Sequence, residues 1–316
     1  MTMPVTRDDI DAAMLRIRGR VRETPVIRTE PLSQPIAAGR LLLKLENLQV
    51  SGSFKARGAT NTILSLDKQD VARGLITASG GNHGLGLAAS ARAAGAAATI
   101  YLPTNTPKAK AEKLTAWGAK VVFEGAVWDQ ANAAALAAAD RDGLTYVHPF
   151  ARPSVIAGQG TVGFEIMNRY PEIDTVVVAI GGGGLISGVA TAVKAMKPEA
   201  RVIGAEPTGA ATLHGSIEAG RLVELAEIAT AANSLAPRKS EQINLDIITR
   251  WVDHIVLVSD AEMLAAARWL WFELGQAVEL SAAAGIAALM TGRLQTSADE
   301  NVCVVICGAG TDGLAP

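Results

Sequence analysis

The feature that most constrains the fold of this chain is a regular alternation between short apolar runs and alanine-rich segments. The apolar runs include GLITAS at 74–79, TVVVAI at 175–180 and VCVVIC at 302–307. Most of them are separated by segments with helical spacing, such as WDQANAAALAAADRDG at 128–143. Strands that alternate with helices in this way are typical of parallel sheets covered on both faces. The sequence therefore predicts an α/β protein.

The length of the chain indicates more than one compact unit. At 316 residues it exceeds the size at which a single hydrophobic core usually stops growing. A series of tight strand–helix repeats lies between the residues near 74 and those near 147. We therefore expect a small inserted domain at 74–147 and a larger domain built from 1–73 and 148–316.

Charge and cysteine content exclude several classes of partner. Lysine and arginine number 29 against 31 aspartates and glutamates, so no basic surface for nucleic acid or an anionic membrane is expected. No apolar run approaches the roughly 18 residues of a membrane-spanning helix, and the N-terminus lacks the apolar stretch of a signal peptide. Cys303 and Cys307 lie in one extended run, which cannot close a disulfide between them. We expect reduced thiols, a cytoplasmic location and a small-molecule ligand.

Four successive glycines, Gly181 to Gly184, follow the apolar run at 175–180 and precede a helical segment. Glycines at a strand-to-helix turn leave backbone N–H groups free to bind a phosphate with the help of the helix dipole. A simple tight turn would need fewer glycines. The spacing matches neither the dinucleotide fingerprint nor the P-loop, so the sequence favours a phosphate on a molecule smaller than a nucleotide.

A second cluster of small and polar residues follows the run at 74–79 and also opens a helix. Hydroxyl, amide and N–H donors at a helix N-terminus suit a carboxylate, although such a cluster can also serve as a simple helix cap. The histidines of the chain do not have the spacing of metal ligands. The residues predicted to bind a substrate carboxylate are Ser79, Gly80, Gly81, Asn82 and His83.

The segment SGSFKARGA at 51–59 places Lys55 among small residues directly after Phe54. Most lysines are solvated surface residues, and Lys55 alone would not indicate chemistry. Together with a phosphate-binding loop and a carboxylate-binding helix start, however, it suggests pyridoxal phosphate. This cofactor needs a lysine that forms an imine with its aldehyde, a site for its phosphate and a partner for its ring nitrogen.

With these motifs, the sequence resembles the fold-type II pyridoxal-phosphate enzymes, in the group of serine/threonine dehydratases and serine racemases. The resemblance covers nearly the whole chain, and its motifs occur in the family's order. They are LKLENLQVSGSFKARGA, SGGNHG, HPFARPSVIAGQGTVGFEI and GGGGLISG. It implies the tryptophan-synthase-β-like fold, which has two open, mostly parallel twisted sheets covered by helices.

The resemblance also implies roles for individual residues. Lys55 matches the Schiff-base lysine, Phe54 the residue that packs against the ring, and Asn82 the residue that contacts the phenolate oxygen. Cys307 matches the partner of the ring nitrogen, although its type also fits a small buried apolar residue. Glu279 is expected near the ring, or as a buried structural glutamate. The phosphate loop implied by the resemblance consists of Gly181, Gly182, Gly183, Gly184 and Leu185.

The implied activity is a dehydratase, or ammonia-lyase, that converts an L-β-hydroxy amino acid such as L-threonine or L-serine to a 2-oxo acid and ammonia. Lys55 would act as nucleophile and base, which requires its neutral form. One alternative is a serine racemase. In racemases, however, a serine at the position of Gly80 protonates the substrate carbanion, and glycine has no such hydroxyl. Others are a specialised substrate, such as 3-hydroxyaspartate or a catabolic intermediate, and a binding module without catalysis.

Two further expectations follow from the resemblance. Related enzymes bind a divalent cation, for which this sequence offers Glu206 and the carbonyl of Ala210, but Thr212 replaces the second acidic ligand. Hard cations prefer charged oxygen ligands. Family members also commonly form homo-oligomers, and we expect a dimer or a tetramer.

Overall fold

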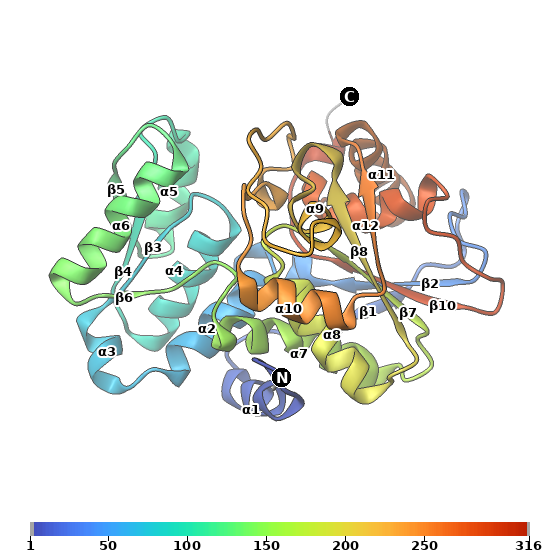
Figure 1. Cartoon of the computed structure of the whole chain (residues 1–316), viewed down its shortest axis with the longest axis horizontal. Coiled ribbons are helices and arrows are strands. Elements are labelled where there is room, and N and C mark those ends of the chain that lie inside the picture. The colour runs from blue at the N-terminus through green and yellow to red at the C-terminus, as the bar shows by residue number, and fades with distance from the viewer. Residues whose placement is uncertain (1–2, 315–316) are drawn as a thin grey trace.

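The computed structural model describes residues 3–314, and its strands form two sheets flanked by helices (Figure 1). The strands of the larger sheet are β1 (Val26–Arg28), β2 (Arg40–Leu45), β7 (Thr175–Ala179), β8 (Arg201–Pro207), β9 (His254–Val258) and β10 (Asn301–Ile306). Those of the smaller sheet are β3 (Leu75–Ala78), β4 (Ala98–Leu102), β5 (Lys120–Phe123) and β6 (Thr145–Tyr146).

Both sheets are almost entirely parallel. The larger has the strand order β1-β2-β10-β7-β8-β9 and the smaller the order β5-β4-β3-β6. Only β1 and β2 pair antiparallel. This confirms the predicted α/β class with two mostly parallel sheets. All strands of the smaller sheet lie within 75–146, and the domain boundaries at 74 and 147 stay a prediction.

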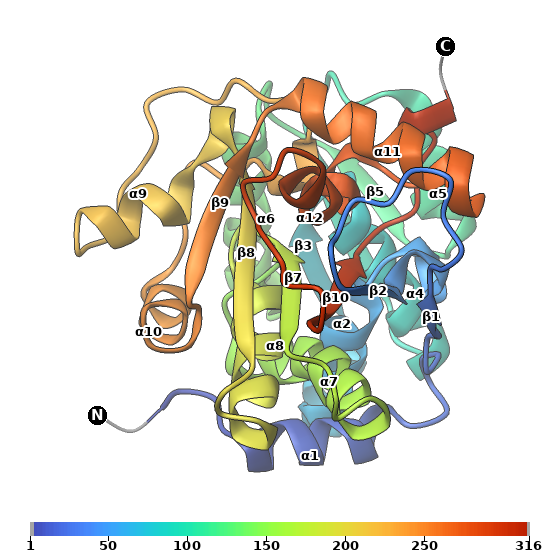
Figure 2. The same ribbon diagram turned by 90° about the vertical axis from the view of Figure 1, so that its right-hand side faces the viewer.

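Helices cover both faces of the larger sheet (Figures 1 and 2). On one side α8 packs against β7 and β8, with α7, α1 and α10 around it, and on the other α12 packs against β7 to β10, with α11 beyond it. These helices are α1 (Arg7–Ile17), α7 (Pro153–Arg169), α8 (Gly184–Met196), α10 (Gln242–Trp251), α11 (Asp260–Leu274) and α12 (Leu280–Met290). The central strand β7 is buried along its whole length, as its continuous apolar run requires.

The smaller sheet is covered by shorter helices. Side chains of α4 and α5 pack on one face and alanines of α6 on the other. The helices of this part and the remaining connections are α2 (Lys55–Ser65), α3 (Lys68–Arg73), α4 (Asn82–Ala94), α5 (Lys108–Ala116), α6 (Trp128–Asp142) and α9 (Thr212–Glu218). The short 3-10 turns are η1 (Glu46–Leu48), η2 (Val50–Gly52), η3 (Thr208–Ala210), η4 (Asn233–Leu235) and η5 (Asp312–Leu314).

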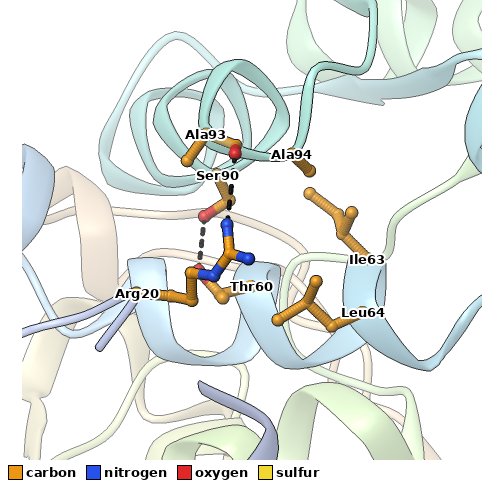
Figure 3. A pocket seen from close by; sticks show the side chains of 7 residues that line it. All are labelled: Arg20, Thr60, Ile63, Leu64, Ser90, Ala93 and Ala94. Carbon is orange, nitrogen blue, oxygen red and sulfur yellow. Dashed lines mark hydrogen bonds between the residues drawn. The ribbon is translucent and has the colours of Figure 1, made fainter. Parts of the chain in front are cut away.

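Helix α2 lies between the two sheets and packs on both α4 and α7. A Cβ on Gly158 of α7 would lie 2.7 Å from the Cα of Gly58, so only glycine permits this close approach of α2 and α7. Thr60 of α2 and Ser90 of α4 share a hydrogen bond of 2.8 Å beside a small pocket (Figure 3). Arg20 closes the pocket by donating to the carbonyl of Ala93 at 3.5 Å. Helix α2 is therefore held from two sides.

A buried ionic network fixes the first turn of α2. The fully buried guanidinium of Arg57 donates paired hydrogen bonds to both Glu46 and Glu165, at 2.6–2.8 Å. Glu165 also pairs with the buried Lys44, and the hydroxyl of Thr24 donates to Glu46. Burial opposes the charge on Arg57, but the two carboxylates outweigh it and raise the Arg57 pKa. Two cations thus balance two anions, and the bonds join α2 to β2, η1 and α7.

Replacing Arg57 with methionine tests the contribution of this network. Removing one member leaves carboxylates buried without their partner, which typically costs about 3–5 kcal/mol of unfolding free energy. We expect Arg57→Met to lower the urea midpoint of unfolding strongly. Lys108→Met, which removes the exposed Lys108–Glu112 pair, is the control and should leave the midpoint nearly unchanged. Equal midpoints for Arg57→Met and the unaltered protein would contradict the assignment.

Candidate active site

Lys55 is the first residue of α2 and is joined to the segment that follows β10. Ser53 and Gly308 form a β-bridge, and the N–H of Phe54 donates to the carbonyl of Cys307 at 3.2 Å. Because β10 lies between β2 and β7, these contacts bring Lys55 to the carboxyl edge of the larger sheet. Open parallel sheets bind their ligands at this edge.

The environment of Lys55 favours its neutral form. Its Nζ donates to the carbonyl of Pro149 at 2.7 Å and lies 5.1 Å from the centre of the Phe54 ring. Burial lowers the pKa of Lys55 to about 8, although Cys307 and Glu279 act in the opposite direction. A substantial fraction of this amine is therefore uncharged near pH 8, as a nucleophile or base requires.

The glycine loop Gly181–Gly184 leads from β7 into α8. Gly183 is the N-cap of α8 and has φ of +91°, a conformation that favours glycine. A Cβ on Gly182 would lie 2.3 Å from the ring of Phe150, so the loop and this ring are in direct contact. The first N–H groups of α8, including that of the buried Leu185, have no acceptor within the helix. The loop can therefore bind an anion.

Asn82 and Glu279 form one polar cluster with Ser234. The Asn82 amide and the Ser234 hydroxyl each donate to Glu279 Oε1 at 2.8 Å, and Ser234 also bonds Ser281. Burial raises the pKa of Glu279, although Ser234 and Asn82 act in the opposite direction. Sequence reasoning selected Asn82 and Glu279 but missed Ser234 as a partner. Its only signal was the unusual TAANSLA segment at 230–236.

Cys307 lies directly after β10, on the same carboxyl edge as Lys55. Cys303 and Cys307 are both free and buried, as predicted. Burial raises the pKa of the Cys307 thiol, and Glu279 acts in the same direction. The thiol is therefore neutral. A neutral thiol can form a hydrogen bond with a ring nitrogen, but it cannot act as a negatively charged partner.

The predicted carboxylate-binding residues, Ser79, Gly80, Gly81, Asn82 and His83, lie together between β3 and the first turn of α4. Gly81 is the N-cap residue of α4, and its N–H lies 3.4 Å from the Ser79 hydroxyl. The His83 side chain turns elsewhere, with its Nε2 3.0 Å from the carbonyl of Val147. Burial, followed by Lys55, lowers the His83 pKa to about 3, so the ring is neutral. A role of His83 in carboxylate binding would rest on its backbone N–H.

His148 is a second neutral ring near Lys55 that sequence reasoning missed. Burial and then the charge of Lys55 lower the His148 pKa to about 4. Its Nδ1 accepts backbone N–H bonds from Phe150 at 3.2 Å and Ala151 at 3.0 Å, and its ring stacks edge-on against Phe150. His148 therefore shapes the turn that carries the acceptor of Lys55 and the ring against the glycine loop.

The residues suggested for a divalent cation are committed to hydrogen bonds. The carboxylate of Glu206 accepts two backbone N–H bonds from α9, each at 2.9 Å. The hydroxyl of Thr212 donates to the carbonyls of Pro237 at 2.7 Å and Ala210 at 3.4 Å. Within residues 3–314, no group of three or more histidine, cysteine or acidic residues could hold a metal ion. This donor set does not fit a divalent cation, which takes several, mostly charged, oxygen ligands.

Comparison with known proteins agrees with this geometry. A family model described as "Pyridoxal-phosphate dependent enzyme" matches residues 17–308. An L-threonine ammonia-lyase of Thermotoga maritima is 38% identical over 98% of this chain and 76% of its own length. A catabolic L-threonine dehydratase of Staphylococcus aureus is 35% identical over 98% of this chain and 90% of its own. The structure of maize serine racemase superimposes with a TM-score of 0.92 at 33% identity, covering 97% of this chain and 94% of that one.

The chain therefore belongs to the pyridoxal-phosphate-dependent enzymes of fold type II, in the serine/threonine dehydratase family. Its residues fit the cofactor. A half-buried lysine with a lowered pKa, a glycine loop with free N–H groups and a neutral thiol lie at one edge of the sheet. The hydroxyls of Ser51 and Ser53, just before Lys55, are buried without a hydrogen-bond partner among the described residues. Buried polar atoms of this kind call for a ligand or ordered water.

Among the described residues, no helix combines the length and the apolar character needed to cross a membrane. The residue roles that the resemblance implies stay predictions.

The pH dependence of Lys55 labelling tests the lowered pKa. In the cofactor-free protein, trinitrobenzenesulfonate should modify Lys55 increasingly as the pH rises, with a midpoint near 8, because only the neutral amine reacts. Peptide mass spectrometry separates Lys55 from the exposed Lys108, which serves as the reference for reagent reactivity. A midpoint near 10 for Lys55 would contradict the effect of burial.

Proposed function

We propose that this enzyme is an ammonia-lyase that converts an L-β-hydroxy amino acid, with L-threonine and L-serine as the first candidates, to a 2-oxo acid and ammonia. The observation that carries the proposal is the position of Lys55, whose pKa burial lowers to about 8, at the same sheet edge as the glycine loop. The names of the relatives, L-threonine ammonia-lyase and L-threonine dehydratase, support the substrate class.

Each proposed role follows from the chemistry of the residue. The N–H groups of the glycine loop would hold the phosphate, Phe54 would pack against the ring and the Cys307 thiol would meet the ring nitrogen. Bound pyridoxal phosphate would supply an electron sink for the electrons released when the substrate Cα–H bond breaks. The neutral amine of Lys55 would accept that proton. The Cα proton and the β-hydroxyl together would be lost as one water molecule, and hydrolysis of the remaining unsaturated amine would give the 2-oxo acid and ammonia.

The substrate-binding roles rest on the start of α4. Backbone N–H groups after Ser79 and the positive end of the α4 dipole would bind the substrate carboxylate. Asn82 would contact the phenolate oxygen of the ring, and Glu279, which accepts the Asn82 amide at 2.8 Å, would hold that amide in place.

Racemisation is the second candidate, because maize serine racemase superimposes closely. Gly80 carries no proton donor, and a Cβ at this position would meet the apolar ends of Leu102 at 3.3 Å and Thr106 at 3.4 Å. No acid would therefore face the substrate from this side. We propose that racemisation is minor compared with elimination.

Location and assembly are further parts of the proposal. Two buried free thiols support a reducing, cytoplasmic location. Exposed aromatic side chains on α11, Trp271 at 47% and Phe272 at 70%, support a homo-oligomer, either a dimer or a tetramer.

A 2-oxo acid assay tests the proposed reaction. The cofactor-loaded protein should release 2-oxobutyrate from L-threonine or pyruvate from L-serine, and Lys55→Ala should lose roughly 10²- to 10⁴-fold or more of this activity, because the base is gone. Parallel assays with 3-hydroxyaspartate and for D-serine distinguish the alternatives. Release of D-serine in excess of pyruvate would favour racemisation. A cofactor absorbance band that responds to no amino acid would favour a binding module.

A further inference from the structure

The peptide between Gly182 and Gly183 is held from behind by two buried polar side chains. Its carbonyl oxygen, on Gly182, accepts a hydrogen bond from Asn244 Nδ2 at 2.7 Å and another from the Ser240 hydroxyl at 2.9 Å. Both side chains are fully buried, and Asn244 lies in the first turn of α10. Nothing in the resemblance to known enzymes singled out either residue.

The geometry of the peptide bond turns this contact into an orientation of the loop. In a planar trans peptide the C=O and the N–H point in opposite directions. Holding the Gly182 carbonyl toward α10 therefore aims the N–H of Gly183 away from α10. Within residues 3–314, no protein acceptor is recorded for the N–H groups of Gly181, Gly182 or Gly183. They remain available to a ligand.

The loop needs hydrogen bonds from outside because its own sequence does not set its conformation. Glycine adopts positive and negative φ about equally readily, so a run of glycines can rotate its peptide planes at little cost. Gly183 has φ of +91° and precedes the first residue of α8. An outside contact on the Gly182 carbonyl selects one of these orientations.

Asn244 is itself fixed in the correct direction. Its Oδ1 accepts the Ser187 hydroxyl at 3.2 Å, which turns Nδ2 toward the carbonyls of Gly182 and, at 3.3 Å, Phe150. Phe150 follows Pro149, the acceptor of Lys55. The single amide of Asn244 thus contacts both the glycine loop and the segment that holds Lys55.

We propose that Asn244, supported by Ser240, is a positioning residue that aims the N–H of Gly183 at the anionic group bound by the glycine loop. The inference rests on the proposed function, which makes that group the phosphate of pyridoxal phosphate. Asn244 acts through the backbone and does not touch the ligand.

The test compares two ligands that differ only in the phosphate. Cofactor-free protein is titrated with pyridoxal phosphate and with pyridoxal, and binding is followed by absorbance. Because ring and aldehyde are the same, other parts of the site contribute equally to both affinities. Asn244→Leu removes the donor at similar size. It should weaken binding of pyridoxal phosphate roughly tenfold or more, the effect of one lost buried hydrogen bond, and leave pyridoxal binding nearly unchanged.

Two further variants make the result specific. Asn61→Leu is the matched control, because the buried Asn61 amide also donates to a backbone carbonyl, that of Ser154, but away from the loop. It should lower stability without changing the ratio of the two affinities. Ser240→Ala removes the weaker support of the Gly182 carbonyl and should lower the ratio in the same direction. It also provides the test if Asn244→Leu does not fold.

The outcomes separate the inference from the proposed function. A selective loss of affinity for pyridoxal phosphate, with a changed ³¹P resonance of the bound phosphate, supports the positioning role. Equal losses of affinity for the two ligands would overturn it. Unchanged affinity for pyridoxal phosphate in both Asn244→Leu and Ser240→Ala would also overturn it. If the unaltered protein binds pyridoxal as tightly as pyridoxal phosphate, the phosphate-binding role of the glycine loop fails instead.

Discussion

The arrangement of this site depends on the buried guanidinium of Arg57. It lies two residues after Lys55 and bonds Glu46, next to β2, and Glu165, in α7. A buried charge is stable only when it is paired and fully hydrogen-bonded. These bonds therefore permit few other positions of the α2 N-terminus. Close packing of Gly58 on Gly158 adds a steric limit. The lysine is thereby held at the sheet edge before any ligand binds.

The second determinant is that several titratable groups around this lysine are held neutral. The thiol of Cys307 and the rings of His83 and His148 are all kept neutral by burial. Burial also favours the neutral amine of Lys55 itself. A phosphate bound by backbone N–H groups would then add a strong negative charge near the reacting atoms. In the proposed role of Cys307, a neutral thiol at the ring nitrogen would make a weaker electron sink than an acidic partner, which would favour elimination over reactions with long-lived carbanions.

Much of this was predictable from local sequence patterns. Alternating apolar runs and helical segments predicted the parallel sheets, and glycine-rich turns after β3 and β7 predicted where helices α4 and α8 begin. Long motifs identified the family, and the residues they selected, Lys55, Asn82, Glu279 and Cys307, are brought to one edge of the sheet. Their catalytic and binding roles stay predictions.

The remaining contacts depend on residues far apart in the chain, for which a single sequence carries no signal. Ser234 reaches Glu279 across 45 positions, and Asn244 reaches Gly182 across 62. The direction of the His83 ring, toward Val147, was also not predictable. The sequence does not show whether a side chain in the first turn of a helix faces the ligand site or the neighbouring chain segment. The cation site could be doubted from Thr212, but only the structure shows the Glu206 carboxylate engaged by α9.

Borohydride reduction of the cofactor-loaded protein, followed by peptide mass spectrometry, shows which lysine carries the cofactor. The reagent makes a bond between pyridoxal phosphate and a lysine permanent. We expect one phosphopyridoxyl group, located on Lys55. A label on another lysine, or none at all under conditions that saturate the cofactor absorbance, would contradict it.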